Sequence, residues 1–317
     1  MSGQALQLVE REPMLVFLEE RLRAPMLFDV LLAPLRDFLT RPGKQLRARF
    51  VSLAWQLAGG RGEPPAELAL ALELLHAGSL IVDDVEDGTE ERRGAPALHV
   101  RAGLPTALNA GNWLYFAALE MLGDLPVGEG RVSIVLRRAH ALLALCHEGQ
   151  ALDVGVRVAD VPQREVAGLA RAISERKTGG LAALCTSLAA ICAGAPWNVE
   201  SALSAFGTSL GVGLQILDDT GCIASEERRA KGAEDLRNGR ATWAWAALAE
   251  ALDPDRYQRL IRNPDLEEMR QLLGDRGRRL AARELQGALA KLRDALGPGR
   301  AVEQATALIA AMEKSYG

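Results

Sequence analysis

The chain has 317 residues, which is enough to bury a large core in one or two domains. Its formal net charge of −4 gives no support to nucleic-acid binding as a main role. The 49% hydrophobic content with only 4% aromatic residues, together with frequent Ala, Leu, Arg and Glu, favours helices. Four cysteines without a CxxC pair do not form a disulfide framework in a chain of this length.

Helical periodicity runs through almost the whole sequence, and strand patterns are scarce. Gly and Pro residues interrupt it at 42–43, 59–65, 94–96, 123–130, 159–163, 194–197, 254 and 297–299, which predicts about ten helices. No linker or low-complexity segment divides the chain. The sequence therefore predicts a single all-α domain over residues 1–317, a bundle of long helices around a deep central cavity that is a natural ligand site.

The sequence shows neither the pattern of a signal peptide nor that of a membrane span. Residues 1–14 contain no basic stretch followed by an apolar one, so no signal peptide is expected and the cytoplasm is the expected location. Two long uncharged runs, 178–198 and 201–217, are interrupted by Gly, Ser and Thr, and the first contains Pro196. A membrane span needs about 20 mainly apolar residues. We therefore expect tightly packed core helices and no transmembrane segment.

The most informative stretch is ELLHAGSLIVDDVEDGTEERRG, residues 73–94. In a helix, Asp83 and Asp87 share a face and Asp84 lies about 100° around from Asp83. Three carboxylates on one sector repel one another unless a cation is present, and oxygen ligands at this spacing suit Mg²⁺. The basic pair at residues 92–93 would suit phosphate oxygens.

A solvated acidic helix end followed by a basic turn is the alternative interpretation of this stretch. The flanking Leu80, Ile81 and Val82, with further leucines one turn before, argue against it. They predict that the acids line a cavity in an apolar wall.

A second acidic pair follows the second uncharged run. Gln215, Asp218 and Asp219 lie on adjacent faces of the predicted helix, and Cys222 stands where a third carboxylate would repeat the first cluster. Two acidic helix sites facing each other across a cavity would hold several Mg²⁺ ions against a diphosphate. The alternative is an ordinary aspartate pair at a helix end that Gly221 terminates.

Basic residues elsewhere are individually weaker signals. Lys44 and Arg47 are three apart and share a helix face, although surface pairs of this kind are ordinary. Lys177 lies between apolar stretches, which makes it a candidate for a half-buried phosphate contact. His76 lies seven residues before Asp83, about 10 Å along the same face. A lone histidine on an apolar face is more often a core residue.

Together these features resemble the trans-polyprenyl diphosphate synthases (isoprenyl diphosphate synthases), in order over residues 43–242. The segments that carry the resemblance are GKQLR at 43–47, the stretch at 73–99, ALNAGN at 107–112, EGQALDV at 148–154, Lys177-Thr178, LQILDD at 214–219 and EDLRNGRAT at 234–242. The DDxxD pattern alone is shared with terpene cyclases. The ordered set, with RRG four residues after DDxxD, is specific.

The resemblance implies an isoprenoid-synthase-type bundle, a homodimer and a Mg²⁺-dependent prenyltransferase. The implied reaction is head-to-tail condensation of isopentenyl diphosphate with an allylic diphosphate (dimethylallyl, geranyl or farnesyl). By motif position, Mg²⁺ would be bound by Asp83, Asp84, Asp87, Asp218 and Asp219. The allylic diphosphate would be bound by Arg92, Lys177 and Gln215. The isopentenyl diphosphate would be bound by Lys44, Arg47, His76 and Arg93, and Gln150 and Thr178 would line the reacting carbons. The expected catalytic residues are Asp83, Asp84, Asp87, Lys177 and Asp218.

The chain departs from the family pattern mainly around the second motif. Cys222 stands where the family usually has an aspartate, Ser225-Glu226 stands where it usually has Gly-Asp, and Lys231 is displaced by about one residue. In addition, Arg240 stands in place of the usual Lys, Asn112 in place of the usual Asp and Val82 in place of the usual His. A weakened second metal site is therefore expected. Two alternatives stay open: a class I terpene synthase on the same scaffold, and a non-catalytic subunit of a heteromeric prenyltransferase. The intact first motif argues against the subunit, and the retained isopentenyl residues argue against a pure cyclase.

Product length is predicted from the turn before the first motif. Gly78 and Ser79 are small where short-chain members of the family often have aromatic residues, and DDVED has no insertion. A deep cavity and a product of C20 or longer follow, unless Trp113, Tyr115 or Phe116 closes the cavity lower down. A Gly78→Phe substitution is expected to shorten the product towards C15.

Overall fold

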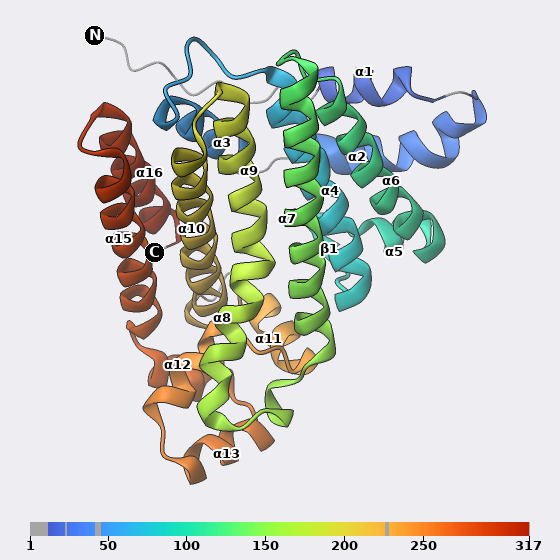
Figure 1. The fold of residues 1–317 in the computed structure, drawn as a ribbon. Coiled ribbons are helices and arrows are strands. Elements are labelled where there is room, and N and C mark those ends of the chain that lie inside the picture. Colours follow the sequence, from blue (N-terminus) through green and yellow to red (C-terminus); the bar gives the residue numbers. More distant parts are fainter. Residues whose placement is uncertain (1–11, 23, 42–45, 226–227, 317) are drawn as a thin grey trace. The chain divides into compact units, whose positions relative to one another are not determined.

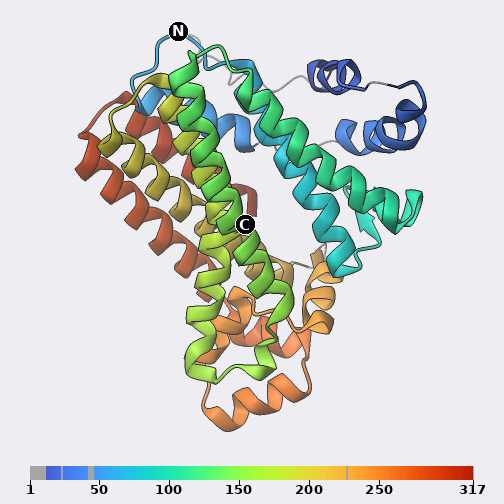
Figure 2. The same cartoon turned by 45° about the vertical axis from the view of Figure 1, so that its right-hand side comes forward.

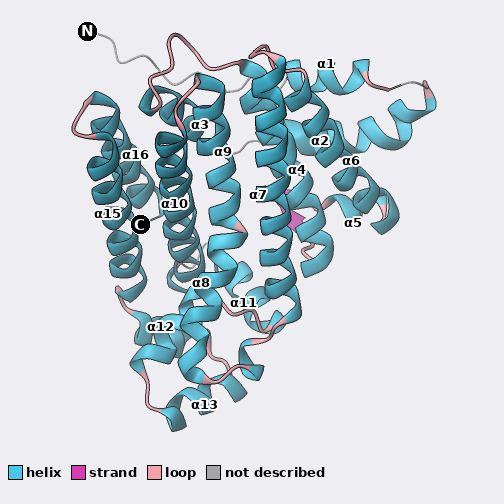
Figure 3. Ribbon diagram, in the orientation of Figure 1, coloured by secondary structure: helices cyan, strands magenta, loops and turns pink. Residues whose placement is uncertain are grey.

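The computed structural model describes residues 12–22, 24–41, 46–225 and 228–316. Helices form almost all of the regular structure in this part of the chain, and the strands there are one short hairpin, β1 (Glu91–Arg92) and β2 (Ala95–Pro96) (Figure 3). The expected all-α class is confirmed. Among the described residues there are more helices than the ten or so expected, because short breaks such as the one at Lys177 divide predicted segments.

The chain divides into two compact units, which are described separately. The first consists of Met1–Ala139 and Leu188–Ala195, and the second of His140–Ser187 and Pro196–Gly317. Two helices, α7 (Glu129–Gly155) and α9 (Thr178–Ala193), contribute residues to both units. The division therefore does not test the expectation of a single domain, which stays a prediction.

The first unit contains the N-terminal helices, the hairpin and the start of α7 (Figure 1). Its other elements are α1 (Glu12–Glu20), a π-helical turn η1 (Phe28–Leu32), α2 (Ala33–Thr40), α3 (Leu46–Leu57), α4 (Ala66–Asp87), α5 (Leu98–Ala102) and α6 (Leu104–Gly123).

Close packing of α4 against α6 forms the centre of this unit. The two helices lie side by side in both views (Figures 1 and 2). A Cβ atom on Gly78 would lie 2.7 Å from the backbone oxygen of Gly111 and 3.3 Å from Leu114 Cβ. Bulk at Gly78 would therefore meet backbone before it met any cavity. The premise that Gly78 has room for bulk beside the cavity is therefore wrong, because this residue lies in the contact between the two helices.

The second unit contains the remaining helices. These are η2 (Val158–Asp160), η3 (Gln163–Glu165), α8 (Val166–Arg176), α10 (Trp197–Ala224), α11 (Arg229–Asn238), α12 (Trp243–Ala251), α13 (Pro254–Arg262), α14 (Leu266–Leu273), α15 (Arg276–Leu296) and α16 (Arg300–Tyr316), with most of α7 and α9 as stated above.

The longest helix of the second unit, α10 with 28 residues, packs along α15 and also contacts α8, α11 and α12 (Figure 1). The uncharged runs weighed above as membrane spans form α9 and most of α10, and both helices are largely buried in the protein. No helix in the described ranges is both long enough and apolar enough to span a membrane.

Candidate functional site

The first aspartate motif occupies the C-terminal end of α4. Gly88 ends the helix in the left-handed conformation, with φ of 67°, and donates its N–H to Asp84 O. Asp84 faces the interior and is only 1% exposed, whereas Asp83 and Asp87 are partly exposed. This arrangement agrees with the helical geometry, which separates Asp84 from the face that Asp83 and Asp87 share.

Arg92 joins the hairpin to the first motif. Its Nε donates to Asp84 Oδ1 at 2.7 Å, its Nη2 contacts the same oxygen, and its Nη2 lies 3.9 Å from Asp83 Oδ2. Burial raises the pKa of Asp84, and the Arg92 hydrogen bond opposes that shift. Asp84 Oδ2 is buried and has no hydrogen-bond partner within the described residues. One oxygen of this carboxylate thus remains open to a cationic partner.

Arg93 lies at the tip of the hairpin in an unusual backbone conformation. Arg92 pairs with Ala95, so Arg93 and Gly94 form a two-residue turn with φ values of 56° and 75°. Positive φ at both positions is what a type I′ turn requires. The left-handed conformation costs a residue other than glycine roughly 1–2 kcal/mol. The chain thus places an arginine where Asn or Gly would be easier to accommodate.

Four of the expected ligand-binding residues of this unit converge. Burial lowers the pKa of His76 well below 6.5, and the positive charges of Arg47, Arg93 and Arg92 lower it further. Nδ1 of His76 is buried and without a hydrogen-bond partner among the residues that the structure describes. A neutral imidazole among three guanidinium groups is an environment that favours an anion. Lys44 lies outside the described residues.

The residues of the first motif fit a divalent cation only together with other ligands. In the described ranges, no three His, Cys, Asp or Glu side chains converge closely enough to hold an ion by themselves. Mg²⁺ usually takes one or two carboxylates and completes its shell with water and substrate phosphate. Partly exposed Asp83 and Asp87 and the open oxygen of Asp84 supply such donors.

In the second unit, Lys177 lies at the junction between α8 and α9. Its Nζ donates to Asp153 Oδ2 on α7 at 2.7 Å. Arg240 donates its Nη1 to the backbone oxygen of Asp153, so two cationic side chains contact this residue. Gln150 precedes Asp153 by about one turn on the same helix and is partly exposed. Asp153 was not among the residues expected from the sequence, although it belongs to the EGQALDV segment.

A chain of hydrogen bonds joins α9, α10 and α12. Thr178 Oγ1 donates to Gln215 Oε1 at 2.5 Å, and Gln215 Nε2 donates to Asp219 Oδ1 at 2.6 Å. The backbone N–H of Trp243 donates to Asp219 Oδ2 at 2.8 Å. Close approach at Gly211, where a Cβ would lie 2.5 Å from Thr178 O, brings α10 near enough for the first bond. These hydrogen bonds fix the orientation of the Gln215 amide group, with its oxygen towards Thr178.

Asp218 has a different partner from its neighbour. Arg228, which follows α10, donates to Asp218 Oδ1 at 3.3 Å and to Asp218 O at 2.9 Å. Cys222, which occupies the position of the third carboxylate that the motif lacks, is 1% exposed. Arg228 was not expected from the sequence; its only signal there is its place after a motif short of one acid. The second motif thus contains a guanidinium group next to its first aspartate.

The structure therefore groups the expected residues within each unit. Arg47, His76, Arg92 and Arg93 lie together in the first unit near Asp83 and Asp84. Thr178, Gln215 and Asp219 lie together in the second, where Lys177 contacts Asp153. Ser225 directly follows α10, whereas Glu226 lies outside the described residues.

Comparisons with known proteins identify the family of the chain. The model of the polyprenyl synthetase family matches residues 28–273, which include both aspartate motifs. A geranylgeranyl diphosphate synthase of Sulfolobus acidocaldarius is 34% identical over 211 residues, covering 64% of this chain and 62% of that protein. The aligned part is thus less than two thirds of that relative's length.

Two further similarities extend over more of the chain. A short chain isoprenyl diphosphate synthase of Methanothermobacter thermautotrophicus is 34% identical over 240 residues, covering 74% of this chain and 71% of that protein. The crystal structure of a geranylgeranyl pyrophosphate synthetase from Pyrococcus horikoshii matches with a TM-score of 0.79 at 25% identity, over 97% of each chain.

Proposed function

Because the chain belongs to the polyprenyl synthetase family, we propose that it is a prenyltransferase that condenses isopentenyl diphosphate with an allylic diphosphate. The product is a trans-polyprenyl diphosphate of C20 or longer, in keeping with relatives named geranylgeranyl diphosphate synthase. The observation that carries the proposal is that the positive charges of Arg47, Arg92 and Arg93 act together on His76, beside the first aspartate motif, where Arg92 also binds Asp84. Anion-binding cations next to metal-binding carboxylates are what a diphosphate with a divalent counter-ion requires.

In the first unit, the roles follow from position in the motifs. Asp83, Asp84 and Asp87 would hold Mg²⁺ together with substrate oxygens, and Arg92 would bind the allylic diphosphate while it pairs with Asp84. A divalent cation bound there would stabilise the negative charge that develops on the departing diphosphate. The isopentenyl diphosphate is assigned to a separate set of residues: Lys44, Arg47, His76 and Arg93.

In the second unit, Lys177 and Gln215 would contact the allylic diphosphate, and Asp218 and Asp219 would hold a second metal ion. Gln150 and Thr178 line the reacting carbons. Thr178 Oγ1 donates its proton to Gln215 Oε1, so the hydroxyl group presents lone pairs and not a proton to its other neighbours. Lone pairs of this kind are a suitable environment for an allylic cation. Arg228 already supplies one positive charge to Asp218. These roles rest on motif position in the sequence.

The chemistry proposed for these residues is charge stabilisation. The carbon–oxygen bond of the allylic diphosphate breaks, the isopentenyl double bond attacks the resulting cation, and the released diphosphate accepts the proton that is lost. Arginine and lysine side chains stabilise the leaving group without exchanging a proton.

The functional form is proposed to be a homodimer. On α6, Leu104, Leu108 and Phe116 are 53%, 38% and 69% exposed and recur at intervals of four or eight residues. Such spacing gives an apolar stripe on one face of the helix, interrupted by the exposed Asn112. A second copy of the chain would cover it. The cytoplasmic location also stays a prediction.

The decisive experiment is incubation with Mg²⁺, isopentenyl diphosphate and each of dimethylallyl, geranyl and farnesyl diphosphate in turn, with analysis of diphosphates and hydrocarbons. The expected result is consumption of isopentenyl diphosphate and a linear diphosphate of C20 or longer. Release of a cyclic hydrocarbon without consumption of isopentenyl diphosphate would assign the chain to the terpene synthases. No conversion of any substrate pair by the folded protein would favour the non-catalytic subunit.

A further inference from the structure

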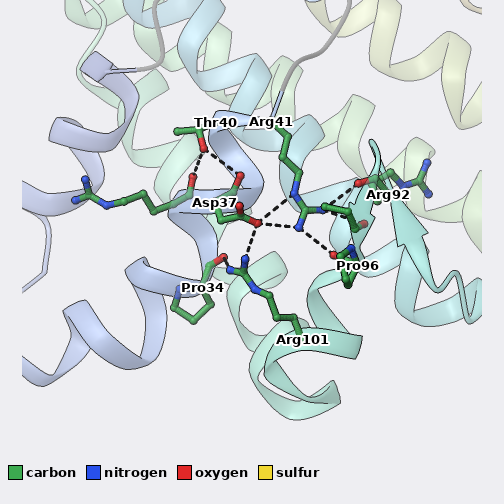
Figure 4. A network of polar contacts seen from close by, with 9 residues as sticks. Pro34, Asp37, Thr40, Arg41, Arg92, Pro96 and Arg101 are labelled. Carbon is green, nitrogen blue, oxygen red and sulfur yellow. Dashed lines mark hydrogen bonds and ion pairs between the residues drawn. The ribbon is translucent and has the colours of Figure 1, made fainter.

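Arg41, a residue outside the family motifs described above, contacts both strands of the hairpin. It follows the last residue of α2, and its side chain is 6% exposed. Nη1 donates to Arg92 O and Nη2 to Pro96 O, each at 2.9 Å, and Nη1 lies 3.5 Å from Ala95 O (Figure 4). The guanidinium group therefore fixes the backbone on either side of the turn that contains Arg93.

Asp37, one helical turn earlier on α2, holds this guanidinium group. Its Oδ2 accepts from Nε of Arg41 at 3.2 Å and from Nη2 at 2.8 Å (Figure 4). The same oxygen lies 2.6 Å from Nη1 of Arg101 on α5, and the Arg41 guanidinium lies 5.6 Å from the centre of the Phe38 ring. The hydrogen bond from Arg41 lowers the pKa of Asp37, so its carboxylate stays charged.

Arg41 contacts the backbone of the turn from which the side chains of Arg92 and Arg93 act on Asp84 and His76. Arg92 offers its backbone oxygen to Arg41 and its side chain to Asp84. Arg93 has a left-handed backbone conformation, with φ of 56°, which persists in a residue other than glycine only where neighbouring contacts enforce it. A hairpin with two residues in each strand has few contacts of its own to supply that constraint.

We propose that Arg41, held by Asp37, is a positioning residue that fixes the Arg92–Arg93 turn for binding of a diphosphate. The proposal deepens the function proposed above and rests on it for the identity of the diphosphate. Arg41 touches no substrate; it acts through the two arginines. Asp37 and Arg41 together form what we call the hairpin clamp.

The clamp requires the shape of arginine as well as its charge. The planar guanidinium group has five N–H donors, and here they reach a carboxylate and carbonyl groups on both strands. A lysine has three donors on one nitrogen and cannot span these acceptors together. Arg41→Lys therefore keeps the charge near the turn but releases at least one strand.

The first test compares Arg41→Lys and Asp37→Asn with Arg36→Gln as a matched control. Arg36 lies on the same helix, is half-exposed and pairs with Glu19. The expected result for both clamp variants is a KM for a diphosphate substrate raised about tenfold, with kcat changed less than about threefold. Arg36→Gln leaves both constants unchanged. Unchanged KM values in both clamp variants would overturn the proposal. So would a fall in kcat as large as the rise in KM, together with a lower melting temperature.

A second test does not depend on turnover. Affinity for inorganic diphosphate is measured by titration calorimetry for the wild type, Arg41→Lys and Arg41→Ala, the last also with added guanidinium ion. Weaker binding in both variants, with partial rescue of Arg41→Ala by guanidinium, supports the clamp. Equal affinities overturn it. If the wild type binds diphosphate but transfers no prenyl group, the proposed function fails while this test of the clamp still stands.

Discussion

The backbone N–H of Trp243 donates to Asp219 Oδ2 at 2.8 Å, so the second aspartate of the second motif satisfies the first N–H group of α12. A carboxylate at a helix N-terminus is favourable because it accepts a free N–H and interacts with the helix dipole. Asp218, the neighbouring residue, pairs with Arg228 on the surface of the same unit. Two adjacent acids of one motif therefore differ in what they contribute to stability.

Asp219→Ala is expected to lower the free energy of unfolding by about 1–2 kcal/mol, because α12 loses its N-terminal acceptor. Asp218→Ala should cost less than about 1 kcal/mol, since a half-exposed ion pair contributes little. Both variants should lose turnover. Urea unfolding followed by circular dichroism measures the difference, and Asp219→Asn, which keeps one acceptor oxygen, serves as the control. Equal destabilisation by the two alanine variants would contradict the capping role.

Asp83→Ala and Asp87→Ala should each lower kcat by at least about 100-fold, because each removes a metal ligand on the partly exposed face of α4. Glu86→Ala on the same turn is the matched control, since Glu86 is exposed and lies outside the motif positions. Steady-state rates at saturating Mg²⁺ give the comparison. A variant of Asp83 or Asp87 that turns over at the wild-type rate would rule out the metal role.

Product length should respond to Ser79 and not to Gly78. Ser79 is partly exposed and lies one turn before Asp83 on the same face, so Ser79→Phe should shorten the product towards C15. Gly78→Ala should leave the product unchanged but destabilise the protein by about 1–3 kcal/mol through overpacking against Gly111. Chromatography of the dephosphorylated products distinguishes the two effects. A wild-type enzyme that already stops at C15 would contradict this expectation.

Stability should fall on acidification because of His76. Its pKa in the folded protein lies below that in the unfolded chain, so below about pH 6.5 the unfolded state takes up the proton first. The residue therefore contributes a loss of about 1.4 kcal/mol per pH unit as pH falls from 6.5 towards the folded-state pKa. The free energy of unfolding measured between pH 5 and 7 should be flatter in His76→Gln.

Phe116→Glu should weaken association of the chain with itself at least about tenfold, because it places a charge in the exposed stripe of α6. Analytical ultracentrifugation over a range of protein concentrations measures the dissociation constant. Glu120→Gln, one turn further along the same helix, is the control. A wild-type protein that is monomeric at every concentration would rule out the proposed homodimer.

Local features of this fold were predictable from the sequence, because they depend on residues close together in the chain. Helical periodicity and glycine breaks identify α4 and its end at Asp87, and the spacing of Asp83, Asp84 and Asp87 predicts which of them is set apart from the other two. The cationic group around His76 was also expected, through the resemblance and the order of the motifs.

Contacts that depend on which helices meet were not predictable in the same way. The helical face of Gly78 follows from the sequence, but its contact with Gly111 depends on the position of α6. The bond from Trp243 to Asp219 spans 24 residues, and the bonds from Arg41 to the hairpin span more than 50. Neither has a periodic signal, so the capping role of Asp219 and the hairpin clamp appear only in three dimensions.

The conformation of Arg93 bears on how this protein would respond to selection in the laboratory. A glycine at position 93 would adopt a φ of 56° without steric cost, whereas arginine does so at roughly 1–2 kcal/mol. A library screened only for heat resistance should therefore enrich glycine at this position, and one screened for product formation should retain arginine. Position 93 would then be a site at which the two screens select different residues, although it lies in a short turn between two strands.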